Sequence, residues 1–187
     1  MGFLDALLGR SKPVPPSLDQ LFALPAAAVT LQAATSFAPT GTGAVCFKAA
    51  EGSAFTDLSE QIDQLLALDT GKYTRQVDSF GFTWLVRQST PDDLEGLVTD
   101  LHAVNSSLQD GGFGASLLCT SVAFTDGARP LGLIYLYKRG TWYPFAPTAA
   151  QRRDNALELQ AQAALGSDLR VEPDLGRWFA VYGAPGL

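Results

Sequence analysis

Three β-prone runs in the second half of the chain constrain its fold more than any other part of the sequence. They are residues 117–124, 131–138 and 141–145, and the turn-forming pairs Asp126-Gly127 and Arg139-Gly140 separate them. Connections this short join antiparallel strands, because a parallel crossover needs a dozen or more residues. We therefore predict a β-meander over this part of the chain.

Further strands are predicted ahead of the meander. Apolar side chains alternate over residues 73–87, and the alternation places four of them on one face: Phe80, Phe82, Trp84 and Val86. We expect Asp78-Ser79 to divide this segment into two strands. The run 44–48 follows the turn signal Gly41-Thr-Gly43 and predicts one more strand.

Apolar residues recur at helical spacing in four other segments. A capping box over residues 17–20 begins the first helix, Pro25 breaks or kinks it, and residues 26–31 continue as helix or strand. The second helix covers residues 55–68. The third begins at Thr90-Pro91 and ends at Gly111, and the fourth begins with a capping box at Thr148 and ends near Gly166.

The order of these elements predicts an α+β fold with a mostly antiparallel sheet and helices packed on one face. A chain of 187 residues is the size of one domain. Three prolines between Ser11 and Pro16 favour an extended spacer. We therefore divide the chain into an amphipathic segment with a Pro-rich spacer, residues 1–16, and a single α+β domain, residues 17–187.

The first ten residues form a candidate docking element. Their apolar side chains share one helical face and are Phe3, Leu4, Leu7 and Leu8. An isolated helix this short is marginal in water, so the face must pack on a partner, on a membrane surface or on its own domain. Deleting residues 1–12 separates these cases. Lowered melting with intact binding indicates packing on the domain, and unchanged melting with lost binding indicates docking.

The charge and the apolar pattern bound the class of protein. A formal net charge of -6 argues against nucleic-acid binding, which depends on Lys and Arg. We find neither a secretory leader nor an apolar run of the roughly 20 residues that cross a bilayer. The 2 cysteines have no motif spacing, which is typical of reduced, buried thiols. We expect a cytoplasmic protein, free or peripheral at the inner membrane face, of unknown oligomeric state.

Residues with catalytic or metal-binding chemistry are few. One His and 2 Cys are too few for a zinc site, and the Gly111–Gly114 segment precedes a strand rather than a helix, unlike a phosphate loop. We therefore expect no catalytic residue, no cofactor and no metal. The alternative is a thiol- or small-molecule-dependent enzyme or sensor, with Cys119, Cys46 or His102 as its reactive groups or with an aromatic pocket between Trp84 and Trp142.

Two aromatic segments, residues 135–145 and 174–182, either fill the core or form a binding surface, since Trp, Tyr and Arg are enriched in binding hot spots. A polar patch is expected around the start of the last helix, because arginines in a first turn oppose the helix dipole unless a carboxylate or a ligand offsets them. Its predicted members are Asn105, Arg152, Arg153, Asp154 and Asn155. The candidate partner-binding residues are Phe3, Leu4, Leu7, Leu8, Asn105, Lys138, Arg139, Trp142, Arg152, Arg153, Asp154, Asn155, Arg177 and Trp178.

Several longer strings resemble one known family nearly end to end. They are the opening Met-Gly-Phe-Leu-Asp-Ala-Leu-Leu-Gly-Arg, Asp-Leu-His-Ala-Val-Asn-Ser at 100–106, Tyr-Leu-Tyr-Lys-Arg-Gly-Thr at 135–141, Tyr-Pro-Phe-Ala-Pro at 143–147, Gln-Arg-Arg-Asp-Asn-Ala-Leu-Glu-Leu at 151–159 and Glu-Pro-Asp-Leu-Gly-Arg-Trp-Phe at 172–179. Together they resemble the PspA-associated protein PspAB family.

This resemblance implies a context rather than a reaction. It implies a non-enzymatic accessory protein of the phage-shock envelope stress response, with PspA or a membrane zinc peptidase as partner and no catalytic residue to carry over. It also implies a fold similar to secretion chaperones. Our leading hypothesis is an adaptor that binds a stress-response protein through its sheet edge or its aromatic tail.

Overall fold

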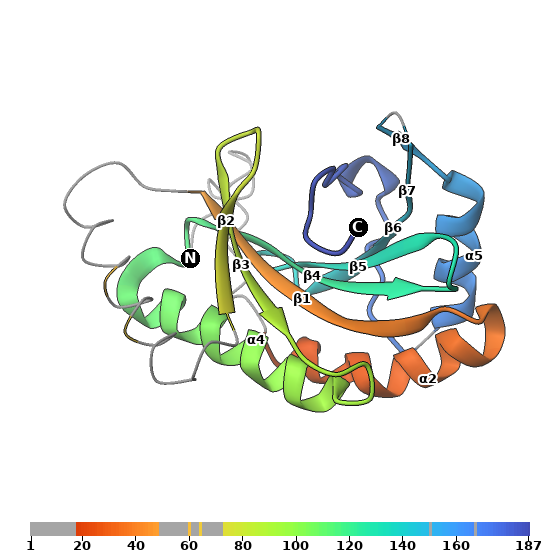
Figure 1. Cartoon of the computed structure of the whole chain (residues 1–187), viewed down its shortest axis with the longest axis horizontal. Helices are drawn as coiled ribbons and strands as arrows, with labels where there is room; N and C mark the ends of the chain where they lie inside the picture. The colour runs from red at the N-terminus through yellow and green to blue at the C-terminus, as the bar shows by residue number, and fades with distance from the viewer. Residues whose placement is uncertain (1–17, 49–59, 61–63, 65–72, 150, 167) are drawn as a thin grey trace, which may run out of the picture.

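The computed structural model describes residues 18–48, 60, 64, 73–149, 151–166 and 168–187, and its centre is an antiparallel sheet (Figure 1). Within the described residues, the sheet has 6 strands in the order β2-β3-β1-β4-β5-β6. The strands are β1 (Ala38–Lys48), β2 (Tyr73–Val77), β3 (Phe82–Gln88), β4 (Leu117–Thr125), β5 (Pro130–Leu136) and β6 (Thr141–Phe145). The predicted meander is confirmed as β4, β5 and β6.

Helices cover one face of this sheet, which confirms the predicted fold class (Figure 1). They are η1 (Leu18–Ala23), α2 (Leu24–Thr35), α4 (Leu94–Leu108), the π-turn η2 (Gln109–Phe113) and α5 (Asn155–Leu165). The apolar stripe of α4, which includes Leu97 and Leu101, is buried against the sheet. Arg87 on β3 donates to Asp100 on α4 at 2.6 Å and ties the two layers together.

The opposite face of the sheet is covered by the C-terminal segment, which we define as residues 172–187 (Figure 1). It includes the short 3-10 helix η3 (Leu175–Arg177). Trp178 stacks on Tyr143 of β6, with ring centroids 6.1 Å apart. Leu187 lies so close to Gly132 that a Cβ atom there would be 2.6 Å from its Cδ1 atom. A residue with a Cβ atom at position 132 would therefore force the Leu187 side chain to move.

The outer edge of β6 is paired with chain that follows α5. The Trp142 N–H donates to Arg170 O at 2.9 Å, and the Glu172 N–H donates to Trp142 O at 2.7 Å. This short parallel bridge satisfies backbone groups that an edge strand otherwise leaves open. A second, two-stranded sheet pairs β7 (Pro147–Thr148) with β8 (Arg152–Arg153).

Several predicted element boundaries were wrong for identifiable reasons. The cap of α4 is Asp93, which accepts from Gly96 N, so Thr90 and Pro91 lie in the preceding turn. The cap of α5 is Asp154 rather than Thr148, because residues 147–153 form the β7–β8 hairpin. The Gly41–Gly43 turn is instead a register shift inside β1, with Gly41 at φ +81°. Most of the predicted helix 55–68, together with residues 1–17, lies outside the described residues.

Candidate functional site

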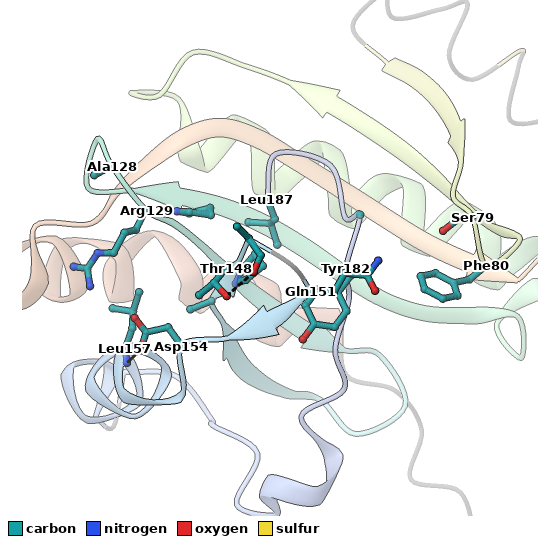
Figure 2. A pocket seen from close by; sticks show the side chains of 15 residues that line it. Ser79, Phe80, Ala128, Arg129, Thr148, Gln151, Asp154, Leu157, Tyr182 and Leu187 are labelled. Atoms are coloured by element: carbon teal, nitrogen blue, oxygen red, sulfur yellow. Dashed lines mark hydrogen bonds between the residues drawn. The ribbon is translucent and has the colours of Figure 1, made fainter.

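A cleft of about 550 Å³ lies on the face of the sheet that carries the C-terminal segment (Figure 2). Its walls come from segments far apart in the sequence. The β2–β3 turn supplies Ser79 and Phe80, and the β7–β8 hairpin supplies Thr148 and Gln151. The loop before β5 together with the first residue of that strand supplies residues 128–130, and the C-terminal segment supplies Tyr182, Gly183 and Leu187. A cleft of this size is within the range of sites that bind small molecules or peptide side chains.

Phe80 is the most exposed large apolar side chain of the cleft. It is 62% exposed, and its ring extends toward the side on which Tyr182 and Gln151 lie (Figure 2). Burial of a large apolar side chain is favourable, so the exposed ring of Phe80 is a candidate contact for a partner.

The turn that presents Phe80 is fixed by Asp78. Its carboxylate accepts from Phe80 N, from Phe82 N and from Trp84 Nε1, each at 2.9 Å. Burial alone would raise the pKa of Asp78, but the hydrogen bonds from Trp84 and from the backbone outweigh it and lower that pKa. The turn is therefore held by an ionised carboxylate, and the backbone that carries Phe80 is fixed by hydrogen bonds.

Gln151 lies on the opposite wall in an unusual backbone conformation. Its φ of +51° is in the left-handed region, which a residue with a Cβ atom rarely adopts. Such conformations cluster at functional sites, where the surrounding structure holds them. The polar groups around it are already engaged: Thr148 Oγ1 donates to Arg152 O at 3.2 Å, and Asp154 accepts from Leu157 N at 3.0 Å. The side chain of Gln151 is exposed.

A buried ion pair between Arg153 and Glu158 holds the chain on either side of α5's first turn. Glu158 of α5 is 2% exposed and accepts from Arg153 Nε at 2.8 Å and from Ala146 N at 2.9 Å. The Arg153 guanidinium also donates to Trp178 O and lies 5.2 Å from the centre of the Phe145 ring. Arg153 therefore joins β8, α5, β6 and the C-terminal segment.

A second ion pair fixes the C-terminal segment to β6. Glu172 has no exposed side-chain surface, and it accepts from Arg139 Nε at 2.5 Å and from Thr141 Oγ1 at 2.8 Å. Burial alone would raise the pKa of Glu172, but hydrogen bonds from Arg139, Thr141 and Asp174 N outweigh it and lower that pKa. Glu172, the first residue of the C-terminal segment, is therefore ionised.

Comparison with protein families identifies the group to which the chain belongs. The family model described as "PspAB: PspA associated protein B" matches residues 1–186. The chain belongs to the PspA associated protein B family. This confirms the resemblance that the sequence strings indicated. No curated protein and no solved structure gave a match.

The structure separates the candidate residues that the sequence grouped in this PspA associated protein B chain. Asn105 is 1% exposed on the helix side, where its Nδ2 donates to Thr120 Oγ1 at 2.9 Å. Arg153 lies over the Phe145 ring, which belongs to the cluster under the C-terminal segment, so the predicted polar patch does not include Asn105. Arg152 and Asn155 are exposed, and Asp154 is the cap of α5.

The aromatic candidates are mostly core residues. Trp142 is fully buried, with its Nε1 donating to Gln20 O at 3.2 Å, and Trp178 is 6% exposed. Arg177 is half exposed and pairs with Asp174 at 3.2 Å. In the basic turn, Lys138 Nζ donates to Ala115 O and Arg139 binds Glu172. The candidate set therefore contains supports of the fold as well as surface groups, and Phe3, Leu4, Leu7 and Leu8 lie outside the described residues.

The residue pairs behind the enzyme and sensor alternatives lie on opposite faces of the sheet. Cys119 and Trp84 belong to the apolar cluster under the C-terminal segment, whereas Trp142 belongs to the cluster under the helices. His102 is on α4, with its ring 4.8 Å from that of Phe22. The sheet therefore separates His102 from Cys119 and Trp84 from Trp142, so neither predicted pocket is formed.

The described residues contain neither a metal-binding cluster nor a membrane-spanning helix. No group of three or more His, Cys, Asp or Glu side chains in this part of the chain is placed to hold a metal ion. Among the same residues, every helix is too short or too polar to cross a membrane.

Sequence reasoning missed the cleft because its walls are brought together only by the fold. The alternation with Phe82 predicts a strand face for Phe80, but Phe80 lies in the turn before β3. The signal that identifies this turn is Asp78 followed by Gly81, which adopts φ +81°. Glu158 and Glu172 gave no signal, since a buried carboxylate looks like any surface acid in a sequence.

Proposed function

We propose that this chain is a non-enzymatic adaptor of an envelope stress response that binds PspA in the cytoplasm. The observation that carries this proposal is the match of residues 1–186 to a family described by its association with PspA. The proposed binding surface is the cleft between the β2–β3 turn and the C-terminal segment.

Two features of the cleft support this surface. The exposed ring of Phe80 stands on a turn that Asp78 fixes, so little backbone freedom is lost when a partner covers it. The facing wall offers Tyr182 together with the free amide of Gln151, and amide groups add direction to an apolar contact. An aromatic anchor with a polar rim is the usual composition of a protein-binding hot spot.

A binding measurement with purified PspA tests the proposal. We expect the full-length chain to bind PspA in calorimetry or in surface plasmon resonance. Phe80→Ala should weaken the affinity at least tenfold, since truncating a hot-spot aromatic costs about 1.4 kcal/mol or more. Gln151→Gly relieves the positive φ and removes the amide, so it should weaken binding without lowering the melting temperature.

The matched control is Phe179→Ala. Phe179 is 58% exposed, close to the 62% of Phe80, but it lies in the C-terminal segment and does not line the cleft. Phe179→Ala should leave the affinity unchanged. If Phe179→Ala weakens binding and Phe80→Ala does not, the aromatic tail is the surface and the cleft is rejected. If wild-type chain and PspA do not bind at all, the adaptor proposal itself fails.

The cleft volume favours a second candidate function, the sensing of a small molecule. A volume of about 550 Å³ suits a ligand of moderate size, with the Phe80 and Tyr182 rings as its apolar walls. Native mass spectrometry of the chain purified from its own host tests this function. A bound mass that Phe80→Ala abolishes supports it, and a bare chain in every preparation rejects it.

A further inference from the structure

The two cysteines of the chain are direct cross-strand neighbours. They are 73 positions apart in sequence, 119 minus 46, yet the register of β1 and β4 places Cys46 opposite Cys119. Both thiols are free and buried, and both belong to the apolar cluster beneath the C-terminal segment. Directly opposed residues of an antiparallel pair have Cβ atoms about 4.5–5.5 Å apart, and a disulfide needs about 3.5–4.5 Å.

The strand geometry at this point favours the small movement that a disulfide requires. A register shift lies between Cys46 and Phe47, and such irregularities allow a strand to bend locally. The direct opposition of the two residues also affects the Cys46 thiol, since the Cys119 side chain and then burial raise the pKa of Cys46. The Cys46 thiol is therefore protonated before oxidation.

We propose that Cys46 and Cys119 are a reversible oxidation site, which hydrogen peroxide converts from two thiols into one disulfide that links β1 to β4. Cys119 is the first to react because it is 6% exposed, against 3% for Cys46. A small neutral oxidant suits a buried pair, whereas a bulky disulfide such as oxidised glutathione would have to unfold the region first. This inference does not depend on the proposed binding of PspA.

The oxidation has two steps. The Cys119 thiolate attacks one oxygen of the peroxide, the O–O bond breaks, and the departing hydroxide takes up the thiol proton and becomes water. Cys119 is then a sulfenic acid. The Cys46 sulfur loses its proton and attacks the sulfenic sulfur, so the S–S bond forms, the S–O bond breaks and a second water leaves. Two electrons pass from the thiols to the peroxide, and an added dithiol reverses the oxidation by exchange.

Intact-mass spectrometry of the full-length chain tests the proposal directly. After treatment of the folded, reduced chain with hydrogen peroxide, we expect a product two hydrogen atoms lighter that runs as a monomer without reductant. Alkylation with N-ethylmaleimide under denaturing conditions should add two labels before oxidation and none afterwards, with no singly labelled species accumulating. Dithiothreitol should restore both labels. The oxidised chain should also melt at a higher temperature, because the link restricts the unfolded chain.

Cys46→Ser provides the control, because it keeps the first-reacting thiol and removes its partner. It should stop at the sulfenic acid, which dimedone labels, with no loss of two hydrogens. If the folded wild-type chain keeps two alkylatable thiols while the urea-unfolded chain is oxidised, burial excludes the oxidant and the proposal is wrong. A disulfide found only in dimers overturns it equally, and both results come from the wild-type chain, whatever the variant does to folding.

Discussion

Replacing Glu172 by Gln tests whether a buried carboxylate fixes the C-terminal segment to the sheet. The side chain keeps its shape, but its charge is lost. The carboxylate accepts four hydrogen bonds, two from Arg139 and one each from Thr141 Oγ1 and Asp174 N. An amide has one accepting oxygen, so its NH₂ group meets two of these donors whichever way it turns. Two bonds and the ion pair are lost.

The expected cost follows from the burial of each partner. A hydrogen bond to a charged group contributes roughly 1.5–3 kcal/mol, but Arg139 is 41% exposed and water replaces part of its share. Thr141 is buried and can keep its bond to the remaining oxygen. We therefore expect Glu172→Gln to lower the free energy of unfolding by about 2–3 kcal/mol at pH 7. Urea unfolding followed by tryptophan fluorescence should show a midpoint lower by roughly 1 M.

The pH dependence gives a second, independent test of the same substitution. The folded-state pKa of Glu172 is lowered, so its contribution is complete above the unfolded-state pKa of about 4.3 and is lost as the pH falls through the folded-state pKa. The difference between wild type and variant should therefore shrink below about pH 4. Asp174→Asn is the control, since its pair with Arg177 is exposed and should cost less than about 0.5 kcal/mol. An equal loss in both variants, or a difference that persists in acid, would refute the reasoning.

Further substitutions test single contacts of the fold and the residues of the enzyme alternative. Arg153→Ala leaves the carboxylate of Glu158 buried with Ala146 N as its remaining donor, so it should lower the free energy of unfolding in urea by about 3 kcal/mol. Arg152 is exposed, and Arg152→Ala should cost less than about 0.5 kcal/mol. Gly41 and Gly81 share a φ of +81°, but a Cβ atom at Gly41 would lie 2.2 Å from Ser89 O, whereas one at Gly81 would meet no atom within 4 Å. In thermal melts, Gly41→Ala should therefore lower the stability by about 3 kcal/mol or more, and Gly81→Ala by about 1 kcal/mol. Under reducing conditions, Cys119→Ala should cost about 1 kcal/mol through lost packing. Cys119→Ala, Cys46→Ala and His102→Ala should each leave PspA binding unchanged. A folded, stable Cys119 variant that loses function would favour the enzyme alternative.

The strands could be predicted from the sequence because their signals are local. The turns at Asp126-Gly127 and at Arg139-Gly140 separate β4, β5 and β6, and Asp78-Ser79 separates β2 from β3, as the sequence indicated. The π-turn at Gly111 and Gly112 likewise follows α4 where the apolar stripe stops. In each case the residues that determine the structure lie within a few positions of one another.

Features that depend on distant partners could not be predicted in this way. Thr148 has a sequence suited to a helix cap, but pairing of Pro147 with Arg153 forms a hairpin there and moves the cap to Asp154. The opposition of Cys46 and Cys119 depends on the strand order, in which β1 lies between β3 and β4. The cleft depends on the C-terminal segment crossing the sheet, and the irregular composition of that segment contains no signal of its destination.

The position of the C-terminal segment also determines the order in which the molecule can be completed on the ribosome. Residues 172–187 follow all six strands in the chain, so the sheet can pair before its second face has a cover. Until Trp178 emerges, apolar side chains such as Ile134 and Phe145 face water on a nearly finished sheet. A nascent chain at this stage presents the kind of surface that chaperones bind, and a ribosome paused at this point would prolong the interval in which such chains aggregate.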